Sequence, residues 1–389
     1  MGPRFIYCVC QVGAEAALRQ EVTGIDPSLR SAFARPGLVT FKLTGGVAEP
    51  SGGGAEAVEA VCAAVRLASV LTRACGGSLG PASTPEQAIE ALRQATDDGA
   101  LLRLQVWERD RWRPGEEPAG FCYGARSAEL RERLVAAWPD DRALAAGSLA
   151  QVGDQVAELI VGAPGEPWLV ALRRQGPGEL PYGGGRIPVE EEPRAPSRAY
   201  YKLCEGLAYA DIPLRAGDVA VELGSAPGGA SFALLRRGLE VHGVDPGAMD
   251  PLVLGYTGPG KNRFTHHACT MGHVKRMHLP RVLQWIVADV NLAPQIALQT
   301  VRRLGARPRP ALLGVLLTLK IDNWKAMRHL PGWLRQVEAM GMVEVGTTQL
   351  SRNRMEVFAY GLTCAGIARR SSPSSSSSSS ASRSSLSVP

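Results

Sequence analysis

The sequence predicts two folded regions, and the second is a doubly wound α/β domain with a mostly parallel, Rossmann-like sheet. After residue 196, short apolar runs alternate with helical segments, which is typical of a parallel sheet with helices on both faces. One run leads straight into a glycine-rich turn. The last two runs are joined by a short polar segment, as in an antiparallel hairpin. We therefore expect a seven-stranded sheet that ends in such a hairpin.

The strands of this region follow from the apolar runs. They are expected at 218–223, 240–244, 264–268, 285–289, 312–320, 343–350 and 355–361. Helices lie between them, and the first helix begins at Ser197, whose hydroxyl can cap it.

The region before residue 181 reads as α+β. Strands are expected at 5–11, 38–43, 101–107, 156–161 and 168–172, helices at 15–22, 55–73 and 85–94, and a loop at 76–85. This part of the sequence carries no catalytic constellation, so it is interpreted as a binding or scaffold unit.

Composition marks the domain boundaries. Residues 181–196 contain a glycine run and an acidic run that interrupt the periodicity, and we interpret them as a linker. The chain before it divides into a ferredoxin-like α+β region at 1–75 and a second α+β region at 76–180. The folded part is expected to end at residue 366, because 367–389 is serine-rich and has too little apolar surface to fold.

Bulk composition narrows the class of protein. The 389 residues are 45% hydrophobic and 21% charged, which is typical of a folded soluble protein. No apolar run approaches the roughly 18 residues that span a bilayer, so we expect a cytosolic protein without a membrane partner. The net charge of +6 is compatible with a polyanionic partner or with a solvated surface. The eight cysteines are scattered without zinc-ligand spacing, which predicts reduced core thiols and no metal site.

The glycine-rich turn predicts a ligand loop. It lies between a strand and a helix, where missing side chains let a ligand approach the backbone. Asp245 ends the next strand, where a carboxylate can accept hydrogen bonds from both hydroxyls of an adenosine ribose. The spacing differs from the G-x-G-x-x-G of dinucleotide enzymes, so S-adenosylmethionine is favoured over a nicotinamide cofactor. The loop residues are Gly224, Ala226, Pro227, Gly228 and Gly229.

Four ionisable residues are the catalytic candidates. Asp289 and Lys320 each end a strongly apolar run, and the carboxyl ends of parallel strands are where ligands bind. Lys202 lies in the helix that begins near Ser197, and Glu356 lies in the final strand. Each residue alone would be read as part of a surface salt bridge, but their joint occurrence favours a catalytic site.

These residues resemble the FtsJ-like RNA 2'-O-ribose methyltransferases. The resemblance is carried by Ser197-Arg198 with Lys202-Leu203, Gly224-x-x-Pro227-Gly228-Gly229, Asp289, Lys320 and Glu356. It covers nearly the whole chain except the serine tail, and it is stronger after Ala195 than before it.

The resemblance implies that 197–366 is an S-adenosylmethionine-dependent methyltransferase domain with a Lys-Asp-Lys-Glu tetrad. It also implies a THUMP-like RNA-binding region at 76–180, and a cytidine of large-subunit (23S-type) rRNA as the methylated nucleotide. The substrate is naked rRNA or a ribosomal precursor particle, and the protein is a monomer or a weak dimer. Ser197, Thr270 and Asp289 are further cofactor contacts. Relatives carry an acidic residue after the third strand, and this chain has none there, so adenine is expected to meet the backbone or Thr270.

The chemistry of the tetrad assigns its roles. A ribose 2'-hydroxyl is a poor nucleophile and must lose its proton as it attacks the methyl group. Lys320 is the candidate base, helped by burial and by the positive charge of Lys202. Asp289 and Glu356 orient the lysines. Burial and the charge of Lys202 lower the pKa of Lys320, whereas the negative charges of Asp289 and Glu356 raise it. The sequence leaves the sign of the net shift open.

A basic rim is predicted beside this site. The stretch 261–287 combines positive charge with histidines and would hold phosphates rather than read sequence. Its members are Lys261, Arg263, Lys275, Arg276 and Arg281, with His266, His267, His273 and His278. Arg352 and Arg354 either add phosphate contacts or solvate a turn. The rival interpretations are a catalytically silent RNA-binding or ribosome-assembly protein, and a methyltransferase that acts on a non-RNA substrate.

Overall fold

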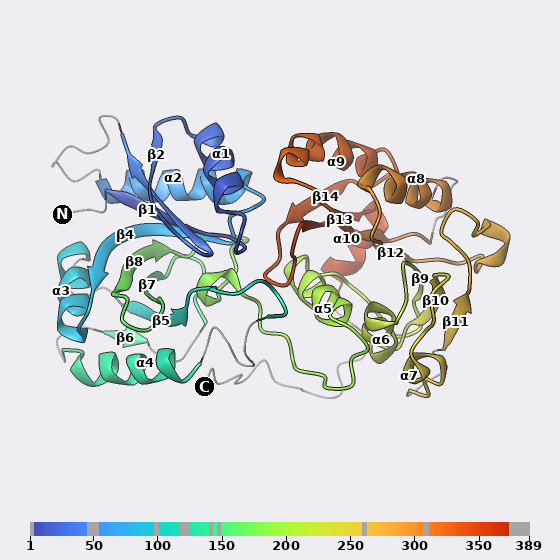
Figure 1. Ribbon diagram of the computed structural model, residues 1–389, viewed down its shortest axis with the longest axis horizontal. Helices are drawn as coiled ribbons and strands as arrows, with labels where there is room; N and C mark the ends of the chain where they lie inside the picture. Colours follow the sequence, from blue (N-terminus) through green and yellow to red (C-terminus); the bar gives the residue numbers. More distant parts are fainter. Residues whose placement is uncertain are drawn as a thin grey trace. The chain divides into compact units, whose positions relative to one another are not determined.

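The protein forms two compact units, which divide between Arg186 and Ile187, inside the predicted linker (Figure 1). Each unit contains its own β-sheet. The computed structural model describes residues 4–44, 54–96, 101–116, 124–139, 143–145, 149–258, 263–305 and 311–372. The predicted serine tail beyond residue 372 lies outside the described residues.

The first unit is built on an eight-stranded sheet with the strand order β2-β3-β1-β4-β8-β7-β5-β6. Helices α1 and α2 pack against β1 to β4, and α3 and α4 pack against β4, β5 and β8. The strands are β1 (Phe5–Val9), β2 (Leu29–Arg35), β3 (Leu38–Leu43), β4 (Ala74–Ala82), β5 (Leu102–Glu108), β6 (Leu144–Ala145), β7 (Gln155–Val161) and β8 (Trp168–Arg174). The helices are α1 (Glu15–Ile25), α2 (Gly54–Ala68), α3 (Pro85–Ala95), α4 (Ala125–Ala137) and the 3-10 turn Gly183–Gly185.

Strand β4 corrects two sequence-based expectations. The predicted loop at 76–85 is mostly this strand, which pairs with β1 on one side and β8 on the other. Small residues are required there, because a Cβ at Gly76 would lie 2.9 Å from a ring carbon of Tyr7. The predicted boundary between residues 75 and 76 therefore falls inside a central strand, and the two predicted α+β regions share one sheet.

Helix α2 also ends earlier than predicted. It stops at Ala68 instead of residue 73, and the chain after it is held by Glu21 of α1. The Glu21 carboxylate accepts hydrogen bonds from the backbone amides of Val70 (3.0 Å) and Leu71 (3.2 Å). A tertiary contact thus replaces the last predicted helical turn. Strand β2 and helix α4 were not predicted.

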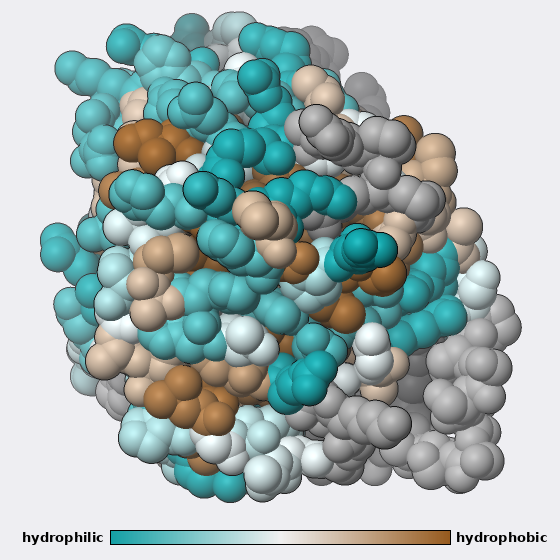
Figure 2. All heavy atoms as spheres, turned by 90° about the vertical axis from the view of Figure 1, so that its right-hand side faces the viewer, coloured by the Kyte–Doolittle hydropathy of each residue, from teal (hydrophilic) through white to brown (hydrophobic). Residues whose placement is uncertain are grey.

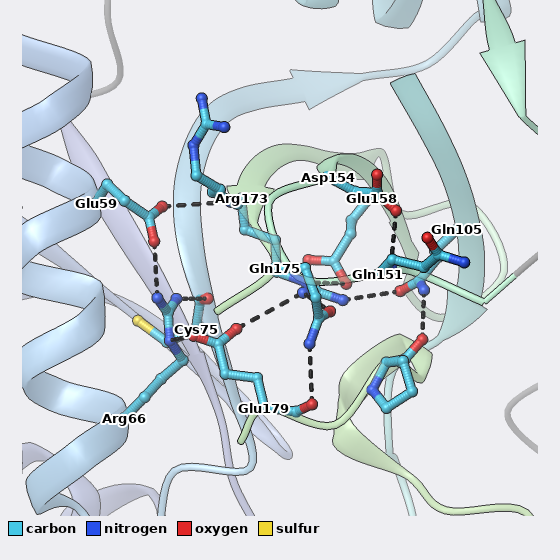
Figure 3. A network of polar contacts seen from close by, with 12 residues as sticks. Glu59, Arg66, Cys75, Gln105, Gln151, Asp154, Glu158, Arg173, Gln175 and Glu179 are labelled. Atoms are coloured by element: carbon cyan, nitrogen blue, oxygen red, sulfur yellow. Dashed lines mark hydrogen bonds and ion pairs between the residues drawn. The ribbon is translucent and has the colours of Figure 1, made fainter. Parts of the chain in front are cut away.

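A buried polar network joins the strands of this sheet (Figure 3). Arg173 of β8 lies 3.4 Å from the carboxylate of Glu158 on β7, and both side chains are buried. Arg173 also donates a hydrogen bond to Gln175 (2.6 Å), and Glu158 accepts one from the hydroxyl of Tyr7 on β1. Burial, with Glu158 adding to it, raises the pKa of Tyr7 well above its ordinary value. The network therefore contains an ion pair whose two charged side chains are buried.

Replacement of Arg173 by methionine is expected to destabilise the first unit by about 3–5 kcal/mol, because it leaves Glu158 as an unpaired buried charge. The measurement is urea denaturation followed by far-UV circular dichroism. Arg174→Met is the matched control, because Arg174 is the exposed neighbour on the same strand. Its effect should stay within about 0.5 kcal/mol. Equal stability of both variants would contradict this account of the network.

The second unit is built on a seven-stranded sheet with the order β11-β10-β9-β12-β13-β15-β14. Pairs among β9 to β13 are parallel, and β15 is antiparallel to both β13 and β14. The strands are β9 (Val219–Leu223), β10 (Glu240–Val244), β11 (Phe264–His267), β12 (Trp285–Asp289), β13 (Gly314–Lys320), β14 (Glu344–Thr348) and β15 (Glu356–Leu362). Each lies within two residues of its predicted range. The helices are α5 (Ala199–Tyr209), α6 (Gly229–Arg236), α7 (Pro251–Leu254), α8 (Pro294–Gly305), α9 (Leu330–Glu338) and α10 (Cys364–Ser371), with 3-10 turns at Arg276–His278 and Trp324–His329.

The strand order reverses at β9, which pairs with β10 on one side and β12 on the other. In open α/β sheets, ligands bind at this switch point, beyond the carboxyl ends of the strands. Trp285 of β12 and Phe232 of α6 are fully or almost fully buried in the core beneath it. The core thus holds the ends of β9 and β12 in fixed positions.

The folded chain extends beyond the predicted limit at residue 366. Helix α10 continues to Ser371 and is fastened by two arginines. Arg369 donates to both carboxylate oxygens of Asp218 (2.7 and 2.6 Å), and Arg370 pairs with Glu344 of β14 at 2.5 Å. These ion pairs explain why the segment is helical although its own apolar content is low.

The described cysteines are free thiols, and most are buried as predicted. Two depart from the prediction, because Cys364 is exposed and Cys269 is half-buried. Cys8 and Cys75 face each other on β1 and β4, with their sulfurs 3.6 Å apart. Burial raises the pKa of the Cys75 thiol well above its ordinary value, which makes it a weak nucleophile. Cys122 lies outside the described residues.

Among the described helices, none combines the length and the apolar character that a membrane crossing requires.

Candidate functional site

Four charged side chains meet at the carboxyl edge of the second sheet. Asp289 ends β12 and Lys320 ends β13, and these neighbouring strands are parallel, so both residues lie at the same edge. Because β15 runs antiparallel to β13, its first residue, Glu356, is the register partner of Lys320. Lys202 comes from α5, which packs closely on β15 because Gly206 leaves room for the ring of Phe358.

The four side chains form a closed ring of alternating charge. The Nζ atom of Lys202 lies 2.7 Å from Oδ2 of Asp289 and 3.0 Å from Oε1 of Glu356. The Nζ atom of Lys320 lies 3.5 Å from Oδ1 of Asp289 and pairs with Oε2 of Glu356. Two lysines and two carboxylates make the ring formally neutral. The side chain of Lys320 is 22% exposed, against 13% for Lys202 and Asp289 and 6% for Glu356, so Lys320 is the most exposed member of the ring.

The ring also sets the direction of two pKa shifts. Burial alone would lower the pKa of Lys320, but Asp289 and Glu356 outweigh it and raise the pKa above its ordinary value. For Glu356, burial acts upward, and the two lysines overcome it and lower the pKa to about 2. The sign that the sequence left open is therefore settled for the free protein. Lys320 carries its proton at neutral pH in this ring.

The depressed pKa of Glu356 predicts a loss of stability in acid. A carboxylate whose folded pKa lies below its unfolded value contributes stability above the unfolded pKa, near 4.5, and that contribution is lost as the pH falls toward 2. The difference in unfolding free energy between the wild type and Glu356→Gln should shrink by about 2 kcal/mol between about pH 7 and pH 3. Chemical denaturation at several pH values measures it. A difference that does not change with pH would contradict the assignment.

The glycine-rich turn packs its backbone against the end of β12. Gly224 has a φ of +81°, and a Cβ there would lie 2.5 Å from the carbonyl oxygen of Asp289. Gly228 has a φ of +121°, and a Cβ there would lie 2.6 Å from Val253. A Cβ at Gly229 would collide with Ser197. The turn is thus a close-packed cradle that brings together several predicted cofactor residues, and the Ala226–Pro227 peptide within it is cis.

Asp245 lies beside this turn at the end of β10. Its Oδ1 atom accepts a hydrogen bond from the backbone amide of Gly247 (2.7 Å), and a Cβ at Gly247 would lie 3.1 Å from that of Ala226. Thr270 lies on the segment after β11, where it is exposed and pairs with the ring of His273 (2.8 Å). The structure thus places Asp245 next to the turn, whereas Thr270 lies on a separate exposed segment.

Ser197 differs from its predicted role as a helix cap. Helix α5 begins at Ala199, and its N-cap position is Arg198, which makes no side-chain cap. The Ser197 hydroxyl accepts a hydrogen bond from the amide of Ala199 at 3.4 Å and lies against Gly229. Its main contact is therefore with the glycine-rich turn.

A family comparison matches part of this unit. Residues 195–302 match the model of a protein family described as FtsJ-like methyltransferase. The matched stretch contains Lys202, the glycine-rich turn and Asp289. This part of the chain is therefore similar to the FtsJ-like methyltransferases.

The chain is also similar to curated proteins named Ribosomal RNA large subunit methyltransferase M. It is 27% identical to the protein of Azoarcus sp. (strain BH72) over 53% of this chain and 60% of that one. It is 29% identical to the protein of Laribacter hongkongensis (strain HLHK9) over 53% of this chain and 55% of that one. The chain therefore spans somewhat more than half the length of these relatives. Among solved structures, TrmN from Thermus thermophilus aligns over 92% of this chain with 15% identity and a TM-score of 0.31.

Two buried carboxyl groups of the second unit were not predicted from the sequence. Glu222 of β9 lies fully buried before the glycine-rich turn, where it accepts a hydrogen bond from the hydroxyl of Ser231. Burial raises its pKa to about 8, so this carboxyl is largely neutral at pH 7. Glu205 of α5 is also buried. The sequence signal that could have revealed each carboxyl group is a single acidic residue within a mainly apolar segment.

Glu205 holds the turn that leads into β15. It accepts hydrogen bonds from the backbone amide (2.9 Å) and hydroxyl (2.6 Å) of Ser351 and from the amide of Arg352 (3.0 Å). Asn353 in the same turn donates to Oε1 of Glu356 at 3.4 Å. Glu205 and Asn353 therefore position one carboxylate of the ring without being members of it.

Most residues of the predicted basic rim of the second unit lie in the described part of the chain. Arg263 is 73% exposed, and Lys275, Arg276 and Arg281 are exposed as well. Figure 2 shows the side of the molecule that carries β11 and α7, where hydrophilic residues dominate and hydrophobic patches are small and separate. Lys261 lies outside the described residues.

The histidines of this stretch are engaged with each other and with the backbone. His267 lies 3.1 Å from His242, and His266 lies 2.9 Å from the carbonyl oxygen of Asp245. Within the described ranges, no group of three or more His, Cys, Asp or Glu residues could hold a metal ion. Arg352 stacks on Tyr201 with its guanidinium 4.9 Å from the ring centroid.

Proposed function

We propose that this protein transfers a methyl group from S-adenosylmethionine to a ribose 2'-hydroxyl of RNA, at a cytidine of large-subunit (23S-type) rRNA. The observation that carries the proposal is the closed Lys-Asp-Lys-Glu ring beside the glycine-rich turn. A ring of this kind offers a proton acceptor and a means to balance its charge, which an alcohol nucleophile needs. The names of the curated relatives support large-subunit rRNA as the substrate.

The residues around the turn fit the proposed cofactor. The carbonyl oxygen of Asp289 and the side chain of Val253 fill the space beside Gly224 and Gly228, so these glycines let the turn pack closely, and Asp245 at the end of β10 offers carboxylate oxygens to ribose hydroxyls. When bound, S-adenosylmethionine supplies a methyl group on a positively charged sulfur. Asp289 belongs both to the ring and, through its carbonyl oxygen, to the wall behind Gly224. The adenine contact at Thr270 or its backbone stays a prediction.

Lys320 takes the proton of the attacking hydroxyl in this mechanism. The O–H bond would break toward Nζ of Lys320 as the hydroxyl oxygen takes up the methyl group that the bound cofactor would supply. Lys320 must first be neutral, although the resting ring favours its charged form. The ring is neutral before ligands bind, so an added cation nearby makes release of one lysine proton favourable. Asp289 and Glu356 then hold the Nζ atom in place.

The first unit is assigned to RNA selection. Its residues 76–180 would act as the THUMP-like RNA-binding region and its residues 1–75 as the ferredoxin-like part, on the one shared sheet. The exposed arginines and lysine of the basic rim would bind phosphates close to the reacting ribose.

The proposal is tested by measuring whether a radioactive methyl group is transferred to RNA or to protein. The protein is incubated with labelled S-adenosylmethionine and either deproteinised large-subunit rRNA or a precursor particle, and the RNA and protein fractions are then separated. We expect label in RNA from at least one of the two preparations. Label in protein together with unlabelled RNA would overturn the substrate class.

A further inference from the structure

A pocket of about 430 Å³ opens on the sheet of the first unit. This volume falls in the range of roughly 300–1,000 Å³ that is usual for small-ligand sites. Residues of β2, β3, β4 and β8 line it, including Phe33, Arg35, Leu38, Thr40 and Trp168. None of these residues has a role in the chemistry of the second unit.

The strand register shows which residues of β2 and β3 share the face of the sheet on which the pocket lies. Leu38 and Thr40 alternate along β3 with Val39 and Phe41, which are fully buried, so the two pairs point to opposite faces of the sheet. Directly opposed residues of an antiparallel pair share a face, and Phe33 opposes Thr40 while Arg35 opposes Leu38. Phe33 and Arg35 therefore stand over the face of Leu38 and Thr40, on an edge strand.

The pocket presents an aromatic ring that the fold leaves accessible. Phe33 is 47% exposed, and the guanidinium of Arg35 lies 4.2 Å above its ring centroid. Trp168, the first residue of β8, also lines the pocket, but its side chain packs against the core on the side of α3 and α4, and the guanidinium of Arg133 lies 6.0 Å from its ring centroid. Unpaired bases of RNA stack on aromatic rings and on arginine planes, and such contacts do not require a particular sequence.

The charge of the lining distinguishes this pocket from a purely apolar groove. Glu166 is the acidic residue of the lining, and it lies 2.9 Å from Arg109 and 3.8 Å from Arg35. A hydrogen bond from the amide of Ala163, together with Arg109, lowers the pKa of Glu166, so it stays ionised. Two arginines against one carboxylate leave a net positive charge on the lining, which suits a phosphate next to a stacked base.

We propose that this pocket binds one unpaired nucleotide of single-stranded RNA. The base stacks on the ring of Phe33 beside Arg35, and the phosphate lies toward Arg35. The inference rests on the proposed function only in taking RNA as the partner. It requires no methyl transfer, so binding can be tested separately.

Fluorescence anisotropy of a labelled oligoribonucleotide, about ten nucleotides long, tests this with the full-length protein. Phe33→Ala should weaken binding of the single strand about tenfold or more, because it removes a stacking surface. Trp112→Ala is the matched aromatic control, since Arg111 stacks on Trp112 at 4.2 Å outside this pocket. For charge, Arg35→Glu is compared with Arg30→Glu, an exposed arginine on the same strand.

The expected result is a loss of affinity for Phe33→Ala and Arg35→Glu, with both controls within about twofold of wild type, and no effect of Phe33→Ala on a fully paired RNA duplex. Wild-type affinity in Phe33→Ala, or equal losses for duplex and single strand, would overturn the inference. Methyl transfer is measured in parallel. If the pocket variants lose binding of the single strand but the wild-type protein methylates no RNA, the proposed function is wrong and the pocket assignment stands. If the wild-type protein methylates RNA but the pocket variants bind the single strand normally, the pocket assignment alone is wrong.

Discussion

Lys320→Ala is expected to lower the rate constant of methyl transfer to RNA by about 10²-fold to 10⁴-fold, which is the range for removal of a general base. The substitution removes the most accessible amine of the ring, and Lys202 remains between Asp289 and Glu356. Binding of S-adenosylmethionine should persist, because Lys320 does not contact the glycine-rich turn. Single-turnover kinetics with saturating labelled cofactor measures the effect.

The control for this variant is Lys325→Ala, which removes an exposed lysine five residues further along the chain. It should retain wild-type activity. The raised pKa of Lys320 adds a pH signature, because the neutral amine becomes more abundant as the pH rises. Wild-type kcat/KM should therefore increase between about pH 6 and pH 9, and the residual rate of Lys320→Ala should not. Unchanged activity of Lys320→Ala would exclude this residue as the base.

Gly224→Ala is expected to weaken binding of S-adenosylmethionine at least tenfold, or by about 1.4 kcal/mol. The added methyl group would lie 2.5 Å from the carbonyl oxygen of Asp289. This contact can be relieved only if the turn or the end of β12 moves, and Asp289 also belongs to the ring of Lys202, Asp289, Lys320 and Glu356. Isothermal titration calorimetry gives the dissociation constant.

Gly217 provides a matched control for that experiment. Its φ of +87° is close to the +81° of Gly224, but a Cβ at Gly217 would have no atom within 4 Å. Both alanine variants therefore carry similar backbone strain, of about 1–3 kcal/mol, and only Gly224→Ala adds the collision. Cofactor affinity should survive in Gly217→Ala. Equal affinities in the two variants would show that the close approach to Asp289 is unimportant.

The second unit could be predicted from the sequence in considerable detail. Its central strands are buried on both faces, so they appear as continuous apolar runs, and a charge at the end of such a run is conspicuous. Asp289 and Lys320 were found in this way. Glu205 and Glu222 were missed because their partners, Ser351 and Ser231, are identified only by the folded arrangement.

The first unit shows where sequence patterns lose information. Strand β4 contains glycines and a proline, which taken alone indicate a loop. Its place between β1 and β8 requires those small residues, because the ring of Tyr7 and the side chain of Arg173 fill the space beside Gly76. A strand whose sequence is set by its neighbours cannot be recognised from its own residues. The pocket beside Phe33 was missed for the same reason, since its walls come from strands far apart in the sequence.

The position of the transferred methyl group tests the central claim most directly. Large-subunit rRNA labelled by the wild-type protein is digested to nucleosides, which are separated and identified by mass spectrometry. The account predicts that the label appears in 2'-O-methylcytidine, with the mass of the methyl group on the ribose fragment. Label on a base fragment would contradict ribose methylation and, with it, the role given to the ring of Lys202, Asp289, Lys320 and Glu356.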